Sequence, residues 1–562
     1  MKDKFLTAVL LLGLFASRGA FAQNQYCLPH FANGKFGTVS FRTTFILFNN
    51  TNSPVQAVLA ISDDGGNPLS TTIGGLGSGS QFTLNLDAGA TSILQTDGSG
   101  NGAVGAAKVT ATAVIGVSAI FTIYDANGNY MTEAGVGSSD PLTDFVLPVD
   151  STGAFLTGLA LFNPGDSAAA ITLTLINTDG GQADSPASKS LSAGGHTAFF
   201  VAAAGQLFPS VTNFRGTLRV RSSVPIAALV LRQYQNSTQL SYTSLPAVPS
   251  TSTRLGLNLA HAANGSYGSI SFKTSFLIFN ISSSAANVVL TLTRDNGSAF
   301  VVTFPGSGPG TGTNNTFSFT LAAGASVFLQ TDGLGAGTSG SATITSDVPI
   351  GASAIFTVFD SHGQFQTEAG VGDSPVLTSL TIPVDLTGSF DTGVAFFNPG
   401  SGSTVLSFTL LDSTGTIAGS GSQQTLVAKN HLAVFVDQLF PGTKNFRGSL
   451  AVSASAGVSA TTLRQNSVSS SYTTYTTLPI ASGTASGRAQ VALLLSKTET
   501  GITATGNLRL DETLSSGFKL SGTVTGSNPS DSSQGRSITA SAGGNSQYAS
   551  MVNPQTHKYL MV

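Results

Sequence analysis

The sequence contains a long internal repeat, and no other feature constrains its fold as strongly. Residues 28–246 and 259–480 match along their whole length, with an offset that stays between 231 and 235 residues. The phrase TGLALFNPGDSAA at Thr157, for example, returns as TGVAFFNPGSGST at Thr392. Self-similarity on this scale is typical of proteins built from stacked structural units. We therefore expect two copies of one architecture, which differ by insertions of loop size.

Each copy also contains a weaker repeat of roughly half its length. FILFNNTNSP at Phe45 resembles LALFNPGDSA at Leu159, and LDAGATSILQ at Leu86 resembles LSAGGHTAFF at Leu191. The chain is therefore predicted to hold four related modules, named A1, A2, B1 and B2 in chain order. Their predicted boundaries are 23–148, 149–248, 254–383 and 384–481.

The periodicity inside the modules is that of β-strands. In AITLTLIN, Ile171, Leu173 and Leu175 fall on one side and Thr172 and Thr174 on the other, as in a strand with one buried face. Runs of this kind alternate with turn-rich segments, and the chain has 65 glycines and no helical periodicity. The predicted fold class is all-β, with tandem immunoglobulin-like β-sandwich modules of about seven short strands each.

Turn signals separate the predicted strands. In the repeated phrase a strand runs into Asn163, Pro164 and Gly165, and Pro followed by Gly suits a type II turn, which needs a positive φ at the glycine. We interpret the phrase as a strand end and a chain reversal, and its recurrence as a sign of duplication rather than of a binding site. The dipeptides that suit tight hairpin turns are Asp64-Gly65, Asp179-Gly180 and Asn296-Gly297.

The segment 1–22 has the pattern of a secretory signal peptide. Lys2 and Lys4 precede an apolar run, and Ala-Phe-Ala at 20–22 fits an A-x-A cleavage site, so the mature chain is expected to begin at Gln23. The apolar run is shorter than the roughly 20 residues that span a bilayer, and an uncleaved anchor is the alternative. No integral membrane span is expected after removal of the signal. The protein is predicted to be secreted or held at the cell surface, with the periplasm as the alternative.

Cys27 is the single cysteine of the chain, so no intramolecular disulfide can form and burial has to supply the stability. We expect an unpaired thiol near a loose N-terminus. The alternatives are a lipid anchor on this cysteine, which the preceding Asn-Gln-Tyr does not favour, and an intermolecular disulfide.

The charge composition excludes two classes of protein. Only 9% of the residues are charged and 41% are hydrophobic, and the formal net charge is −3. Removal of the signal takes away three basic residues and one acidic residue, which leaves −5. Nucleic-acid binding needs clustered positive charge, which is lacking here. Disordered chains have few apolar residues and a high net charge, and this composition does not fit them.

The sequence changes character after Pro479. Residues 486–562 contain short alternating runs, such as AQVALLLS and FKLSGTVTG, that do not match the modules. We expect a small separate β-unit here, completed by its own strands or by another chain.

Three segments resemble cofactor or metal sites. The segments 100–105 and 335–340 satisfy G-x-G-x-x-G, but a dinucleotide site needs a helix after the motif, and the next residues indicate a strand. Asp125 to Asn129 resembles the start of a calcium loop, but the twelfth position is Val136 rather than a bidentate Glu. No cofactor and no metal site is predicted, and calcium at the module junctions stays open.

No catalytic motif is found. His30 and His261 occupy equivalent places in the two copies, as do His196 and His431, but none of them has zinc-site spacing. The sequence contains no G-x-S-x-G elbow and no P-loop. No catalytic residues are predicted, and the protein is predicted not to be an enzyme.

Charged residues recur at equivalent places, although charges are rare in this chain. They could bind an anionic or polar ligand, or they could form an arginine–carboxylate network that fixes the junction between the modules of each pair. We favour the junction, with Glu133 and Arg232 as the pair to test, because lone charges in apolar surroundings need partners. The candidate junction residues are Glu133, Asp150, Arg215, Arg232, Glu368, Asp385, Arg447 and Arg464.

The phrases FNPG, LxAG, FRGxL and LPV together resemble tandem immunoglobulin-like modules of large secreted or surface proteins of bacteria. The resemblance covers residues 28–480 and rests on turn phrases rather than on catalytic residues. It implies an extracellular protein that presents or binds something.

Three functions stay open at this point. The first is an exported, non-catalytic repeat protein in adhesion, matrix or scaffolding, with its modules in a semi-rigid rod and an unknown protein or polysaccharide as its partner. The second is a carbohydrate-binding protein, although the chain has no Trp and only 10 Tyr to stack on sugars. The third, an exported hydrolase, needs a polar cluster that we do not find in the sequence.

Overall fold

The protein is described by a computed structural model in which almost all regular structure is β-strand. The described residues are 24–204, 206–237, 239–469, 472–487, 503–513, 517–527, 550–552 and 559–561. The predicted signal peptide lies outside them, as does most of the predicted C-terminal unit. The predicted fold class, all-β with tandem β-sandwich modules in two long repeats, is confirmed.

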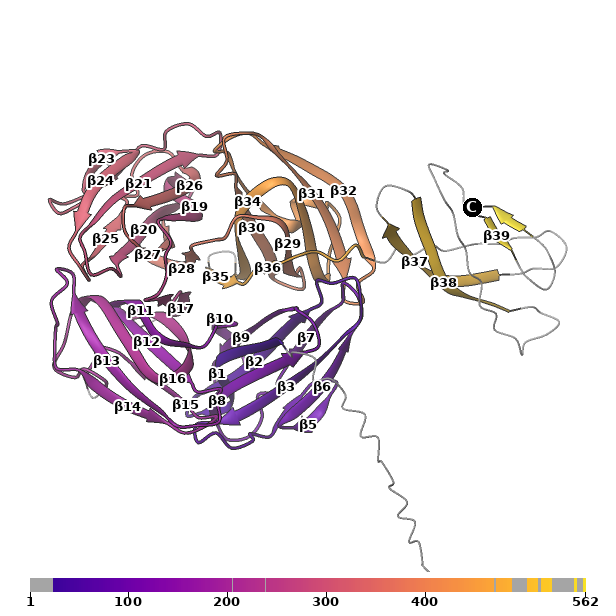
Figure 1. The fold of residues 1–562 in the computed structure, drawn as a ribbon, viewed down its shortest axis with the longest axis horizontal. Helices are drawn as coiled ribbons and strands as arrows, with labels where there is room; N and C mark the ends of the chain where they lie inside the picture. Colours follow the sequence, from indigo (N-terminus) through magenta and orange to yellow (C-terminus); the bar gives the residue numbers. More distant parts are fainter. Residues whose placement is uncertain are drawn as a thin grey trace, which may run out of the picture.

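The strands fall into four groups that follow the chain (Figure 1). Module A1 contains β1 (Asn24–Phe36), β2 (Val39–Phe48), β3 (Val55–Asp63), β4 (Thr71–Ile73), β5 (Gly77–Gly79), β6 (Gln81–Leu86), β7 (Thr91–Gln95), β8 (Ala103–Ala111), β9 (Gly116–Tyr124) and β10 (Tyr130–Gly137). Module A2 contains β11 (Leu142–Ser151), β12 (Phe155–Phe162), β13 (Ala169–Asn177), β14 (Ala187–Leu191), β15 (His196–Phe200), β16 (Phe214–Gln235), β17 (Leu240–Leu245) and β18 (Val248–Pro249).

The second repeat follows the same order. Module B1 contains β19 (Gly256–Tyr267), β20 (Ile270–Asn280), β21 (Ala286–Arg294), β22 (Val302–Phe304), β23 (Gly312–Asn314), β24 (Thr316–Leu321), β25 (Ser326–Gln330), β26 (Thr338–Ser346), β27 (Ile350–Asp360) and β28 (Phe365–Gly372). Module B2 contains β29 (Leu377–Asp385), β30 (Phe390–Phe397), β31 (Thr404–Asp412), β32 (Ile417–Leu426), β33 (His431–Phe435), the short helix α1 (Val436–Leu439), β34 (Arg447–Ser469), β35 (Tyr472–Leu478) and β36 (Ala481–Ser482). Beyond the modules lie two antiparallel pairs, β37 (Thr503–Thr513) with β38 (Gly517–Ser527) and β39 (Ser550–Val552) with β40 (Tyr559–Met561).

Each module is a sandwich of two antiparallel sheets. In A2 one sheet has the order β14-β13-β16-β11-β18, and the other contains β15, β12, β16 and β17. The long strand β16 takes part in both sheets, because its first half pairs with β11 and β13 and its second half with β12 and β17. The inward side chains form the core, as the alternation in β13 predicts: Ile171, Leu173 and Leu175 are at most 2% exposed.

The boundaries between modules lie earlier than predicted. Strand β11 pairs with β16 and β18, so residues 142–148 belong to module A2 and not to A1. Strand β29 pairs in the same way with β34 and β36, so residues 377–383 belong to B2. The phrase LPV at 147–149, which the predicted boundary divides, lies entirely within β11, the first strand of A2.

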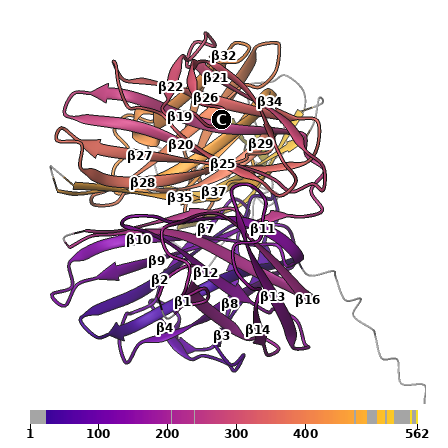
Figure 2. The same cartoon turned by 90° about the vertical axis from the view of Figure 1, so that its left-hand side faces the viewer.

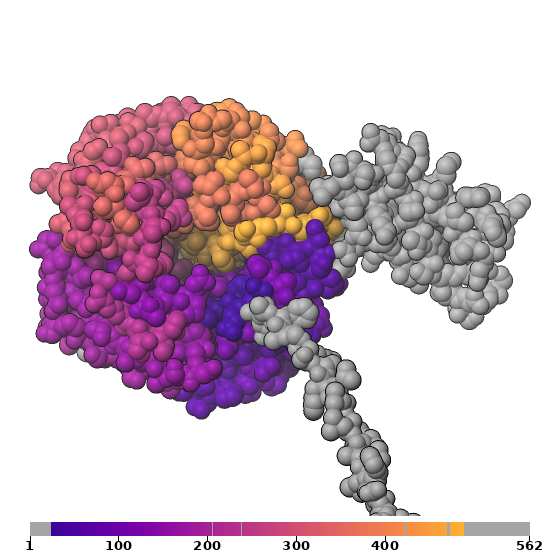
Figure 3. Space-filling view, viewed as in Figure 1, coloured from indigo at the N-terminus to yellow at the C-terminus, as the bar shows by residue number. Residues whose placement is uncertain are grey.

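The four modules form a closed ring rather than the expected rod. Figure 1 shows them as four sectors, and Figure 2 shows the second repeat stacked on the first. The strands β10, β17, β28 and β35 contact one another at the centre, and the Tyr130 hydroxyl of A1 lies 2.8 Å from Thr474 Oγ1 of B2. The space-filling view shows the same closed arrangement (Figure 3). The first module is therefore a neighbour of the fourth.

A hairpin turn of every module docks on a turn of the next module around this ring. The turn after β3, β13, β21 or β31 accepts one backbone hydrogen bond across the interface. The four bonds run from His196 N to Asp64 O (3.1 Å), Ser326 N to Thr178 O (2.9 Å), His431 N to Asp295 O (3.0 Å) and Thr91 N to Ser413 O (3.1 Å). Gly415, in the turn that closes the ring, has φ 83°, and a Cβ there would lie 2.0 Å from Ala88 O. Glycine is needed at this position both for its φ and for the close approach.

The repeated phrase has a different structural basis from the predicted type II turn. Gly165 is described, and its φ is not positive. Instead the side chain of Asn163, which is 0% exposed, donates from Nδ2 to Ser167 O (2.8 Å) and Ser192 O (2.9 Å) and accepts from Gly165 N (3.1 Å). The side chains of Asn49, Asn280 and Asn398 bond in the same way in the other modules. The asparagine ties the strand end to the neighbouring hairpin, because a side chain that satisfies three backbone groups outweighs the local preference of Pro-Gly.

Cys27 is not part of a loose N-terminus. It lies in β1, paired with Lys108 of β8, and is 1% exposed against Ala106, Phe162 and Ala227. Burial raises the pKa of its thiol to about 11. A buried protonated thiol is unreactive, which disfavours the lipid anchor and the intermolecular disulfide.

Replacement of the buried asparagine is expected to destabilise the protein, whereas replacement of the glycine after it is not. Asn163→Ala leaves backbone carbonyls without a donor, so the free energy of unfolding should fall by about 1–3 kcal/mol. Gly165→Ala should change it by less than about 0.5 kcal/mol, because its φ suits alanine. Urea denaturation of both variants checks this. If Gly165→Ala lowered the free energy of unfolding more than Asn163→Ala did, the interpretation of this segment as a type II turn would be favoured again.

Candidate functional site

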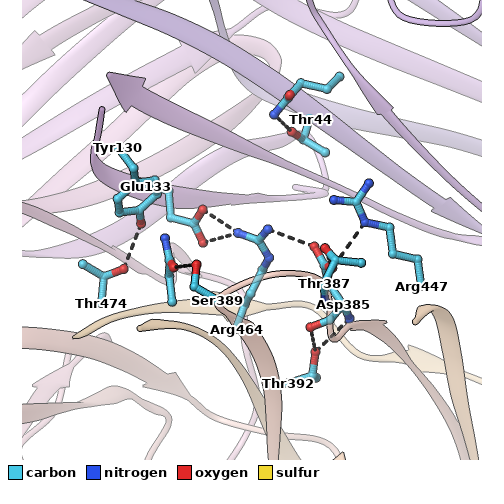
Figure 4. A network of polar contacts seen from close by, with 12 residues as sticks. Thr44, Tyr130, Glu133, Asp385, Thr387, Ser389, Thr392, Arg447, Arg464 and Thr474 are labelled. Atoms are coloured by element: carbon cyan, nitrogen blue, oxygen red, sulfur yellow. Dashed lines mark hydrogen bonds and ion pairs between the residues drawn. The ribbon is translucent and has the colours of Figure 1, made fainter. Parts of the chain in front are cut away.

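Eight charged residues gather at two of the four interfaces, which we call the arginine interfaces. At the one between B2 and A1, Arg464 of β34 donates from one terminal nitrogen to both oxygens of Glu133 (2.7 and 2.5 Å) and from the other to Asp385 (2.9 Å). Arg447 donates from Nε to the second oxygen of Asp385 (3.2 Å), as Figure 4 shows. The guanidinium of Arg464 also lies 3.4 Å from the centre of the Phe390 ring.

The interface between A2 and B1 repeats this arrangement. Arg232 of β16 binds Asp150 (2.9 Å) and is in contact with Glu368 of β28. Arg215 donates from Nε to Asp150 (3.1 Å), and Phe155 lies under the Arg232 guanidinium. The two arginine interfaces therefore hold equivalent residues, four from each pair of neighbouring modules.

All eight predicted junction residues lie in these two clusters, but the junction and the pairing differ from the prediction. Glu133 pairs with Arg464 and not with Arg232, which pairs with Glu368. The network therefore joins one repeat to the other instead of the two modules of one pair. Because the two copies are alike, the sequence alone does not distinguish a partner within the same repeat from one in the other repeat. In the closed ring the partner comes from the other repeat.

The ion pairs are buried and their charges are compensated. The side chains of Arg232, Glu368 and Glu133 are at most 4% exposed. Burial raises the pKa of Asp150, but the charge of Arg232 and the hydrogen bond from Thr152 outweigh it, so the net shift is downward. For Glu368 burial outweighs the Arg232 charge, and its pKa is raised. Loss of either partner would leave a buried charge uncompensated, which is strongly destabilising.

A double-mutant cycle is expected to distinguish the two pairings. Glu133→Gln and Arg464→Met should show a coupling energy of about 1–3 kcal/mol, since the residues share hydrogen bonds. The effects of Glu133→Gln and Arg232→Met should add within about 0.5 kcal/mol, because these residues lie at different interfaces. Urea denaturation of the single and double variants measures both. If Glu133 showed a coupling energy with Arg232 and none with Arg464, the pairing of residues in the closed ring would be wrong.

The other two interfaces, which we call the histidine interfaces, hold a chain of three side chains each. Between A1 and A2, His196 Nδ1 lies 2.8 Å from Asp64 Oδ1, and its Nε2 lies 3.3 Å from His30 Nδ1. Between B1 and B2, Asp295, His431 and His261 repeat the same distances. The carboxylate accepts a hydrogen bond from Nδ1 of the first imidazole, whose Nε2 is then the acceptor for a hydrogen bond from the second imidazole.

The sequence did not predict these chains. The equivalence of His30 with His261 and of His196 with His431 is visible in the sequence, but none of these histidines has metal-site spacing within one segment. A feature of the sequence could have pointed to the chains. Both histidines recur at equivalent places in the two copies, and so does an acidic residue in the docking turn, Asp64 or Asp295. The partners lie 166 residues apart for His30 and His196, so only the fold brings them together.

The histidine chains are better suited to holding the modules together than to catalysis. The aspartate and first imidazole resemble part of a catalytic triad, but the imidazole faces a second imidazole where a triad has its nucleophile. No group of three or more His, Cys, Asp or Glu that could hold a metal ion occurs among the described residues. The resemblance to a calcium loop at Asp125 is explained by a tight turn, in which its carboxylate accepts from Asn127 N and Asn129 N.

Comparison of the sequence with protein-family models and with curated proteins gives no match. The function is therefore inferred from the site geometry and the fold. The G-x-G-x-x-G segments lead into strands β8 and β26, as predicted, and not into helices. Within the part of the chain that the structure describes, no helix is both long enough and apolar enough to cross a bilayer.

Mild acid is expected to destabilise the ring through the second histidine of each chain. Burial, and after it the neighbouring imidazole, lowers the pKa of His30 and of His261 to about 3. An unfolded histidine has a pKa of about 6.5, so the unfolded chain binds more protons between these values. The contribution to stability is complete above pH 6.5 and falls as the pH drops toward 3, by up to about 1.4 kcal/mol per pH unit for each histidine.

Urea denaturation at pH 7 and pH 5 measures this loss. Replacement of both His30 and His261 by Gln should flatten the pH dependence, since an amide does not titrate. His362→Gln is the matched control for the loss of an imidazole, because the side chain of His362 is 84% exposed and lies outside both histidine chains. Equal pH dependence in the double variant and the parent protein would contradict a role for the chains.

Proposed function

We propose that this protein is an exported, non-catalytic binding scaffold that acts at the cell surface or in the extracellular matrix. The observation that carries the proposal is that the recurring charged residues form ion pairs between modules. The eight equivalent charges are consumed in ion pairs that hold the modules together. A ring fixed in this way presents its outer loops in a constant geometry. This favours binding, because ordering loops when a partner binds costs free energy, and preorganised loops reduce that cost.

The large hollow where all four modules meet also fits this proposal better than catalysis. Its volume is about 410 Å³, and it is lined mainly by small and apolar residues. The one charged residue in its lining is Asp140. General acid–base chemistry needs a pair of positioned titratable groups, and this lining does not offer one.

The carbohydrate-binding alternative gains little support from the surface. Sugar-binding faces use exposed aromatic rings, and among the described residues Tyr267 is the one aromatic side chain classed as exposed, at 44%. Leu334 is 73% exposed, and it belongs with Tyr267 to module B1. A single exposed ring offers a small stacking surface, so we prefer a protein or polymer surface as the partner.

Site-specific proteolysis on intact cells tests the location that the proposal requires. A protease recognition sequence inserted between Gly306 and Ser307 would lie in an exposed loop of B1 and leave the sandwich core intact. Cleavage on intact producing cells, or of protein released into the medium, is expected. Protection until the outer envelope is disrupted would place the chain in the periplasm and contradict the proposal.

Loss of the protein tests the role itself. Cells without the chain should attach to surfaces or retain matrix less well than cells that produce it, and the chain with the inserted site should restore attachment until the protease is added. Unchanged attachment and unchanged matrix in cells without the protein would contradict the proposed role. The parent chain without the inserted site controls for effects of the protease itself.

A further inference from the structure

The two arginine interfaces differ in one respect that their shared residues do not explain. The interface between B2 and A1 contains a cavity of about 170 Å³, which borders Arg464 and Asp385. At the interface between A2 and B1, a smaller space of about 20 Å³ borders Arg215 and Phe328, the counterparts of Arg447 and Ile93, but it does not reach Arg232. A cavity of roughly 150 Å³ is large enough to bind a benzene-sized molecule. The larger cavity borders the ion pairs of Arg464 and Arg447 and is bounded on the A1 side by strands β2, β7 and β9.

One residue that lines the larger cavity, Ile93, has a bulkier counterpart in the second repeat. It pairs with Ile46 across β7 and β2, and the equivalent position in B1, paired with Leu277, is Phe328. In the closed interface the guanidinium of Arg215 lies 4.1 Å from the centre of the Phe328 ring. Among the described residues no aromatic ring stacks on the guanidinium of Arg447, and Ile93, which is shorter than phenylalanine, lines the cavity beside it.

Hydrogen-bond donors face this open space. Arg447 uses only its Nε, in the bond to Asp385, and a guanidinium carries four further N–H groups. On the opposite wall, Thr44 accepts a hydrogen bond from Gln95 Nε2 (2.9 Å), so its own hydroxyl proton is available to another acceptor. Both Thr44 and Arg447 line the cavity, and Figure 4 shows how they lie relative to the ion pairs of Arg464.

The charge around the cavity favours an anion. Arg464 and Arg447 balance Glu133 and Asp385, so the ion-pair cluster itself is neutral. Arg42 adds a positive charge 4.9 Å from the centre of the Tyr124 ring, which lines the cavity, and its buried Nε has no hydrogen-bond partner among the described residues. One further negative charge is therefore electrostatically favourable here.

One part of the lining is apolar. Ile46, Ile93, Ile120, Val384 and Leu478 form a wall there, whereas Gln95, Thr122 and Tyr124 add polar groups elsewhere in the lining. Such a wall suits a carbon skeleton and offers nothing to the outer oxygens of an inorganic anion such as phosphate. The side chain of Arg447 is 48% exposed, so the donor group is accessible from solvent.

We propose that this cavity binds a small organic carboxylate, with the carboxylate on Arg447 and Thr44 and the apolar body against Ile93. The site lies within one interface of the ring. It goes beyond the proposed function and does not depend on it.

Calorimetric titration of the full chain with benzoate tests the site, with benzamide as the neutral probe of equal shape and inorganic phosphate as the anion without an apolar body. Benzoate should bind once per chain, and benzamide and phosphate at least tenfold more weakly. Ile93→Phe copies the closed interface, so it should weaken benzoate binding at least tenfold while the protein stays folded. Phe328→Ile should open the second interface and raise the stoichiometry toward two.

Arg215→Met and Arg447→Met form a matched pair, because each removes an arginine that binds an equivalent aspartate through Nε. Only Arg447→Met should weaken benzoate binding. Unchanged benzoate binding in Ile93→Phe, equal binding of benzamide, or no benzoate binding by the parent protein would each overturn the proposal and leave a solvent-filled space. None of these outcomes bears on attachment or on cleavage at intact cells.

Discussion

Closure of the ring is the constraint on which the rest of this structure depends. Module A1 carries an apolar face at Ile46 and Ile120, and Leu478 of module B2 covers it. In an open row of modules this face would be exposed, and repeat proteins of that kind need terminal caps for this reason. The ring makes terminal caps unnecessary, because the first and last modules cover each other's apolar faces. Joining such distant segments costs little more than joining near ones, since the entropy of loop closure grows only with the logarithm of length.

The alternation of histidine and arginine interfaces requires that modules join the ring in complete pairs. Modules A1 and B1 supply the second histidine and the glutamate, and modules A2 and B2 supply the first histidine and the arginine. One pair of modules satisfies its histidine interface internally but leaves Glu133 and Arg232 without their partners. An unpartnered charge on a buried face is costly, so a pair is complete only against a second pair. The arrangement is that of a symmetric dimer whose two halves are joined in one chain.

The sequence predicts the elements of this fold better than their assembly. The alternation around Ile171 and Leu173 depends on neighbours in one strand, and it gave the correct strand and the correct buried face. The eight junction charges were found because charge is rare in this chain, and a rare group on a buried face needs a partner. Their partners were assigned within the wrong junction, since Arg232 and Arg464 are equivalent in sequence. The turn at Gly165 was misassigned because local turn preference does not include the hydrogen bonds of a buried asparagine to a distant hairpin.

Two-fold repetition also separates structural residues from those that closure does not require. Where the copies agree, as at Glu133 and Glu368, each residue fills the same role in one of the two equivalent interfaces. Where they differ, as at Ile93 and Phe328, the ring closes with either side chain, so packing alone does not determine the choice. The ring of Phe328 packs against the guanidinium of Arg215. Isoleucine has no ring for such a contact, and Ile93 lines a cavity instead. A cavity in a close-packed interface forfeits dispersion energy, and that loss is compensated if the space holds a ligand. Departures from the internal symmetry are therefore where we look first for function in a duplicated fold of this kind.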